Sequence, residues 1–177
     1  NNYSGGTIVH GAAGATAVSI VGSGFRGAGT PFGSGAVTVN PGGLVRIADN
    51  ANIAGNAVTL KSDGFGLAGI GIAHNGALPT IITAGVPMAG QVKIESTGPF
   101  GGVLALDYGY YSQDINLASI GNGDWWLGNS GQAEAFYFND TLGANSNGKY
   151  QIGGGGNQSG ITFGSVLVSA GRTSLFE

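Results

Sequence analysis

The chain has 177 residues, enough for one domain with a buried core, and a formal net charge of −3 with only 8% charged residues. Its few basic residues are scattered, so the sequence offers no electrostatic footprint for nucleic acid or for an anionic membrane. It has no cysteine, which excludes a disulfide framework and thiolate metal sites.

Glycine is the most conspicuous residue type, with 37 positions, yet 42% of the chain is hydrophobic. Disordered chains are poor in β-branched residues and rich in charge, whereas Val and Ile are spread along this chain from end to end. The glycines are therefore expected to serve tight turns in a folded protein. No apolar run approaches 18 residues, so no transmembrane segment is expected.

Short apolar pairs with a spacing of two residues recur along the chain, and a small or polar residue separates the members of most of them. This pattern is typical of β-strands with one buried face. In chain order the pairs are Val18/Ile20, Val37/Val39, Val45/Ile47, Val58/Leu60, Ile70/Ile72, Val92/Ile94, Leu104/Leu106, Ile115/Leu117, Trp125/Leu127, Phe136/Phe138, Ile161/Phe163 and Val166/Val168. No window shows a helical period, so the sequence predicts an all-β fold with very little helix.

Turn signals separate these pairs. They include Asn40-Pro-Gly-Gly, Ser62-Asp-Gly, Asn75-Gly, Thr97-Gly-Pro, Gly121-Asn-Gly, Asn129-Ser-Gly and Asn147-Gly. Many short, evenly spaced strands fit a sandwich, a barrel, a propeller or a β-solenoid. The number of Gly- and Asn-containing corners favours a β-solenoid, in which successive coils stack and bury their inward faces.

Two stretches resemble a known repeat. Asn2-Tyr-Ser-Gly-Gly-Thr-Ile-Val-His-Gly resembles the core of the autotransporter-associated β-strand repeat, and Gly33-Ser-Gly-Ala-Val-Thr-Val-Asn-Pro-Gly-Gly-Leu is similar to the strand, turn and strand that follow it. The resemblance covers residues 1–65. Residues 66–177 diverge into longer, more aromatic strands, and we expect residues 1–177 to form a single solenoid segment.

This resemblance implies a right-handed parallel β-helix in a large exported bacterial protein, located at the cell surface or outside the cell. It also explains why the chain begins in mid-motif, as one portion of a longer or polymerising array. We therefore expect a structural rod, stalk or filament with no enzymatic activity and no cofactor. The expected partners are the protein itself, through end-to-end stacking of uncapped ends, and cell-surface or matrix glycans.

An aromatic group offers an alternative function. Tyr108, Tyr110 and Tyr111 are followed by Trp125 and Trp126, and Phe136-Tyr-Phe138 is expected one coil further on. Neighbours in a strand face opposite ways, so both tryptophans cannot lie in one core. The group either fills a wider part of the core or provides surface contacts for glycans or self-association, which would make the chain a carbohydrate-binding module.

A second alternative is a polysaccharide lyase or hydrolase, because parallel β-helices also host such enzymes. It would need two carboxyls about 5 to 10 Å apart, for which Asp107 near Asp124 or Glu134 are candidates. The simpler interpretation, which we favour, is that these acids are solvated turn residues and that no residue is catalytic.

Other motifs carry little chemistry. His10 and His74 have no carboxylate or cysteine at ligand spacing, so no metal site is expected. The run that begins at Gly153 lacks the Asp of calcium-binding repeats and the Lys of a phosphate loop, so it predicts a flexible corner.

Overall fold

The structure is a computed structural model that describes residues 4–11, 19–22, 32–48, 55–63, 66–73, 92–96, 101–111, 115–120, 123–129, 135–137, 142–155 and 161–163. The regular secondary structure of these residues is almost entirely β-strand, which confirms the all-β prediction. The strands are β1 (Thr7–Val9), β2 (Ser19–Gly22), β3 (Val37–Val39), β4 (Gly43–Ala48), β5 (Val58–Ser62), β6 (Gly69–Ala73), β7 (Val92–Ser96), β8 (Gly102–Tyr111), β9 (Ile115–Asn116), β10 (Trp125–Asn129), β11 (Ala135–Tyr137), β12 (Leu142–Gly143), β13 (Gln151–Gly155) and β14 (Ile161–Phe163), and one short 3-10 helix, η1, spans Leu117–Ser119.

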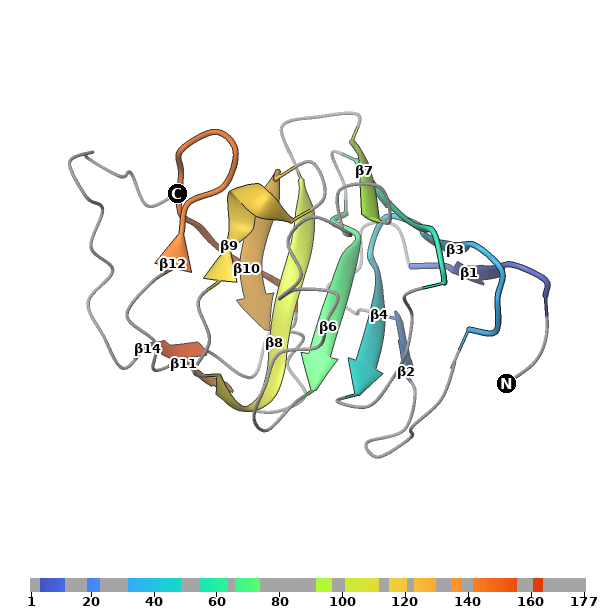
Figure 1. Ribbon diagram of the computed structural model, residues 1–177, viewed down its shortest axis with the longest axis horizontal. Coiled ribbons are helices and arrows are strands. Elements are labelled where there is room, and N and C mark those ends of the chain that lie inside the picture. The colour runs from blue at the N-terminus through green and yellow to red at the C-terminus, as the bar shows by residue number, and fades with distance from the viewer. Residues whose placement is uncertain are drawn as a thin grey trace.

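All pairings between the named strands are parallel, and they join strands that are two or three places apart in chain order. A four-stranded sheet has the order β1-β3-β5-β7, and an eight-stranded sheet has the order β13-β10-β8-β6-β4-β2, to which β11 is added by pairing with β8 and β14 by pairing with β11. Figure 1 shows β4, β6, β8 and β10 side by side along the long axis of the view. The two-stranded sheet β12-β9 is also parallel. This pairing differs from the antiparallel hairpins of a typical sandwich.

The four-stranded sheet buries one line of side chains. Val9, Val39 and Leu60 are register neighbours in β1, β3 and β5, and each is at most 1% exposed. The intervening Thr38 and Thr59 are also register neighbours and are only half-buried. The spacing of two residues seen in the sequence therefore corresponds to one core-facing side of this sheet.

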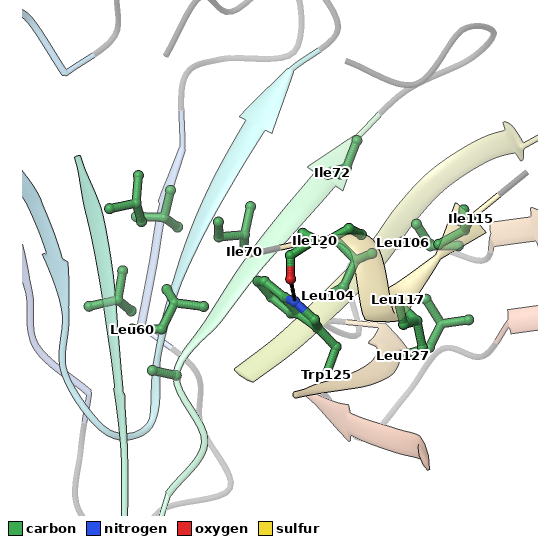
Figure 2. Close-up of a cluster of buried hydrophobic side chains, with 14 of the residues drawn as sticks. Leu60, Ile70, Ile72, Leu104, Leu106, Ile115, Leu117, Ile120, Trp125 and Leu127 are labelled. Carbon is green, nitrogen blue, oxygen red and sulfur yellow. Dashed lines mark hydrogen bonds between the residues drawn. The ribbon is translucent and has the colours of Figure 1, made fainter. Parts of the chain in front are cut away.

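The eight-stranded sheet contributes a second line to the same core. Val45, Ile70, Leu104 and Leu127 are successive register neighbours across β4, β6, β8 and β10, and all are buried. They belong to one hydrophobic cluster with the line from the four-stranded sheet. Figure 2 shows this cluster, with Leu60, Ile70 and Leu104 among its labelled members. Stacked branched side chains in register give close packing without ionic partners.

The corners between strands depend on backbone approaches that only glycine allows. Gly43 N–H donates to Asn40 O at 2.9 Å, and Gly42 has φ +75°, so Asn40-Pro-Gly-Gly forms a turn with Pro and Gly at the positions that a type II turn favours. A Cβ on Gly35 would overlap the carbonyl group of Gly5 in the preceding corner.

Polar side chains hold the corners as well. The buried Asn56 donates from Nδ2 to Gly33 O at 3.2 Å and to Gly35 O at 2.7 Å. These two hydrogen bonds join the corner that precedes β5 to the corner that precedes β3.

Two local predictions were wrong. Leu117 lies in η1 instead of a strand, because Asn116 caps the helix by accepting a hydrogen bond from Ala118 N at 3.2 Å. The run from Gly153 is not a flexible corner over Gly153–Gly155, because these residues belong to β13 and pair with β10. A register shift between Leu127 and Asn129 and the positive φ of Gly153 (+137°) accommodate the glycines.

Candidate functional site

The aromatic group predicted from the sequence centres on the long strand β8. Residues Gly102–Ala105 of β8 pair with β10, and residues Gly109–Tyr111 pair with β11. Between these parts the register with β6 shifts, with Ile72 opposite Leu106 and Ala73 opposite Tyr108. The shift leaves Asp107 without a register partner in β6, which is the pattern of a β-bulge.

The second half of β8 begins a run of aromatic register positions. Tyr111, Tyr137 and Phe163 are successive register neighbours in β8, β11 and β14. Tyr110 and Phe136 are neighbours in the adjacent line. The backbone thus places Phe136 and Tyr137 in register beside Tyr110 and Tyr111, and Phe138 lies outside the described residues. For Tyr108, Tyr110 and Tyr111 the structure describes the backbone and not the side chains.

Trp125 is a core residue. Its side chain is 0% exposed, and the indole Nε1–H donates to Ile120 O at 2.8 Å. Figure 2 shows this hydrogen bond, with the ring among Leu104, Ile120 and other members of the cluster. The hydrogen bond satisfies the one polar atom of the indole inside the core. In this conformation Trp125 has no exposed surface on which a sugar could stack.

Trp126 faces the other side of the same sheet. It is half-buried and packs with the buried Leu44, Val103 and Ala105, next to the partly buried Leu67. Its register neighbours are Val103 in β8 and Gln151 in β13. Within the described part of the chain, the Trp126 Nε1–H is buried and has no hydrogen-bond partner. Of the two tryptophans, only Trp126 has ring surface that a ligand or a partner could reach.

The candidate catalytic carboxylates are not brought together. Gly102 N–H donates to Asp124 O at 3.0 Å, so Asp124 lies level with the start of β8. Asp107 lies about six residues further along that strand, which corresponds to roughly 20 Å at the usual rise. This separation exceeds the distance of about 10 Å that glycoside hydrolysis requires. Glu134 lies outside the described residues.

Asp124 nevertheless occupies an unusual position for an acid. Its side chain packs against Gly101, whose Cβ position would lie 2.7 Å from the carboxyl carbon, and Asn147 Nδ2 donates to Oδ1 at 3.4 Å. Burial raises the pKa of the Asp124 carboxyl above its ordinary value of 3.8.

The described residues do not include a candidate metal-binding site. His10 Nδ1 lies 3.1 Å from Asn40 Nδ2 on the exposed surface. No group of three or more His, Asp and Glu residues that could hold an ion occurs among the residues that the structure describes. His74 lies outside them.

The comparisons with known proteins return no relative. No protein-family model, no curated protein and no solved structure matches this chain. The residues and their geometry therefore carry the functional argument. In addition, the described residues include no helix long and apolar enough to cross a membrane.

Several buried polar residues link neighbouring strands, and the sequence indicated them only as turn residues. Asn129 Nδ2 donates to Leu106 O at 2.6 Å, which joins β10 to β8. Ser62 Oγ donates to Gly101 O at 2.8 Å and accepts from Ala68 N at 2.9 Å. Such residues stabilise the stacking of strands and present no reactive group to solvent.

A similar group closes the last described turn. The buried Asn145 accepts hydrogen bonds at Oδ1 from the backbone N–H groups of Asn147 and Lys149, both at 3.0 Å, and donates from Nδ2 to Gln151 Oε1. The position of an Asn just before a Gly-containing turn was the signal in the sequence, but the identity of its partners depends on the fold.

Proposed function

We propose that residues 1–177 form one right-handed parallel β-helix that serves as a rigid structural segment, a rod or stalk, of an exported bacterial surface or matrix protein. The observation that carries this proposal is the alternation of strands. β1, β3, β5 and β7 pair in one parallel sheet, and β2, β4, β6 and β8 pair in another. A chain that visits two sheets in turn, always in the same direction, climbs by one strand spacing, about 4.8 Å, at each circuit.

The side chains support the same proposal. The register lines are filled by Val, Ile and Leu, and the buried amides Asn56 and Asn129 bind backbone carbonyls of the preceding layer. These contacts hold each layer to its neighbour and use no charge. A segment held together in this way should resist unfolding and proteolysis. The handedness and the extracellular location rest on the resemblance of the first 65 residues to autotransporter-associated repeats.

Solution X-ray scattering and limited proteolysis test the proposal together. We expect an elongated particle that resists a broad-specificity protease. Thr38→Pro is the matched control, because it removes a backbone donor from the middle of the paired strand β3 and should make the chain cleavable. A compact particle that is cleaved as fast as the Thr38→Pro variant would contradict the proposal.

A carbohydrate-binding function is the second candidate, favoured by the reachable ring of Trp126 and by the aromatic line Tyr111, Tyr137 and Phe163. Binding on a glycan array that is lost in Trp126→Ala would support it. Trp125→Ala is unsuitable for this test, because that ring is part of the core. An array without any signal would remove the candidate and leave the structural proposal untouched.

A further inference from the structure

The turn between β12 and β13 is closed by its own backbone (Figure 1). Asn145 N–H donates to Lys149 O, and Gly148 N–H donates to Asn145 O, both at 2.9 Å. Gly148 has φ +73°, the left-handed conformation that glycine adopts without a steric penalty. Asn147 and Gly148 are both exposed at the tip of the turn. The dipeptide that the sequence indicated only as a turn signal therefore lies at the surface.

The side chain of Asn147 is held loosely, against an acid that precedes β10. Its Nδ2 donates to Asp124 Oδ1 at 3.4 Å, which is longer than the usual range for such a bond. By contrast, Asn56, Asn129 and Asn145 are buried, and their amides donate to partners inside the protein. Among the described residues, Asn147 is also the one asparagine that glycine follows. Exposure, loose attachment and sequence therefore coincide at this amide.

We propose that Asn147 is a site of spontaneous deamidation in the folded chain. The backbone nitrogen of Gly148 attacks Cγ of Asn147 and closes a five-membered succinimide ring. The bond from Cγ to Nδ2 breaks, and the proton of the Gly148 N–H leaves with Nδ2 as ammonia. Water then adds to either carbonyl of the ring and opens it, which leaves aspartate or isoaspartate at position 147. Glycine favours the attack because it has no Cβ to obstruct the approach of its nitrogen.

The structure shows what the reaction has to displace. The Gly148 N–H must leave Asn145 O, and the Asn147 amide must leave Asp124, so one backbone bond and one long side-chain bond are lost. Both bonds lie in an exposed turn, where local opening costs little free energy compared with opening of the core. A Cβ on Gly148 would meet no atom within 4 Å, so the ring has room to form.

The product changes the contact with Asp124. A carboxylate at position 147 cannot donate to Asp124 Oδ1, and two ionised carboxylates at this distance repel each other. The deamidated chain should therefore unfold at a lower urea concentration than the unmodified chain. In Asp124→Asn, an amide faces the new carboxylate, and the difference between the two forms should be lost. Equal midpoints for the two forms of the wild-type chain would overturn this consequence.

Peptide mapping by mass spectrometry of the folded wild-type chain, held in mildly alkaline buffer, tests the site itself. We expect the Asn147 amide to be replaced by a carboxyl group over time, with isoaspartate detected by an isoaspartate methyltransferase. The buried Asn145, two residues earlier, is the internal control and should keep its amide. Asn147→Gln is the matched variant, because it keeps an exposed amide but would need a six-membered ring, and it should stay unmodified.

The same chain unfolded in guanidinium chloride provides the reference rate. An Asn147 amide that persists in the folded chain while the unfolded chain is converted would overturn the proposal, because the turn would then protect it. Equal conversion of Asn145 and Asn147 would also overturn it, because the reaction would then proceed through global unfolding. The reaction depends on this turn alone, so its failure would leave the proposed structural function untouched.

Discussion

The two adjacent tryptophans show how strongly a single position in a strand decides the role of a side chain. Trp125 is fully buried and donates to Ile120 O, while Trp126 is half-buried on the opposite side of the sheet and its N–H has no partner in the described part of the chain. The same residue type is thus anchored by a hydrogen bond at one position and held only by apolar contacts at the next.

This difference leads to a matched prediction. Trp125→Phe removes the hydrogen bond from the indole to Ile120 O, which still accepts from Gly123 N–H at 2.8 Å. The lost bond should lower the free energy of unfolding by about 0.5–1.5 kcal/mol, and lost packing adds to that. Trp126→Phe should cost less than about 1 kcal/mol, because its buried N–H has no bond to lose. Urea denaturation of both variants measures the difference. Equal losses would contradict the assigned environments.

The sequence predicted part of this arrangement. The pair Trp125/Leu127 has the period of a buried face, and both residues are in the core. The prediction that Trp125 could be a surface contact was based on the chemistry of its ring, and the sequence did not show which residues surround it. Its environment is set by Ile120, by η1 and by the long-range register with β8, which no local pattern contains.

At the scale of elements, the corners decide how closely successive strands approach. Gly35 lies against the carbonyl of Gly5, and Gly66 would place a Cβ 2.7 Å from Gly42 N. These glycines lack side chains because the backbone of the neighbouring layer occupies that space. Turn propensity alone does not distinguish them from glycines at open positions.

Gly35→Ala and Gly5→Ala test this argument as a pair. The first would force two backbones apart and should destabilise the protein by about 1–3 kcal/mol, as overpacking does. The second adds a methyl group to open space and should be neutral or stabilise by up to about 1 kcal/mol, because it restricts the unfolded chain. Thermal melts of both variants provide the measurement. A larger loss for Gly5→Ala would contradict the approach of these two corners.

The strands could be predicted where apolar residues recur with a spacing of two. The predictions failed where pairing with a distant strand determines the secondary structure. The pairs Val58/Leu60 and Ile70/Ile72 lie in β5 and β6 as expected. The glycines of β13 contain no strand signal, and they are in a strand because β10 lies beside them with hydrogen-bonding groups to satisfy. Backbone pairing of this kind depends on a distant segment and cannot be read locally.

At the scale of the whole molecule, the sparse charge means that stability comes mainly from stacked apolar lines and backbone ladders. Only 8% of the residues are charged, and the register lines of both sheets consist largely of aliphatic side chains. A desolvated acid in such a molecule has few opposing charges to offset it. The titration of such an acid should therefore change the free energy of unfolding of the chain with pH.

Asp124 allows this to be measured. Burial raises the pKa of its carboxyl above 3.8 in the folded state, so the folded chain binds more protons than the unfolded chain just above that pH. The free energy of unfolding of the wild type should therefore fall as the pH rises through this window. Asp124→Asn keeps the shape and the acceptor for Asn147 but cannot ionise, so its stability relative to the wild type should increase over the same window. Urea denaturation of both chains from pH 3 to pH 7 gives the difference directly. A constant difference would show that Asp124 is not desolvated by the fold.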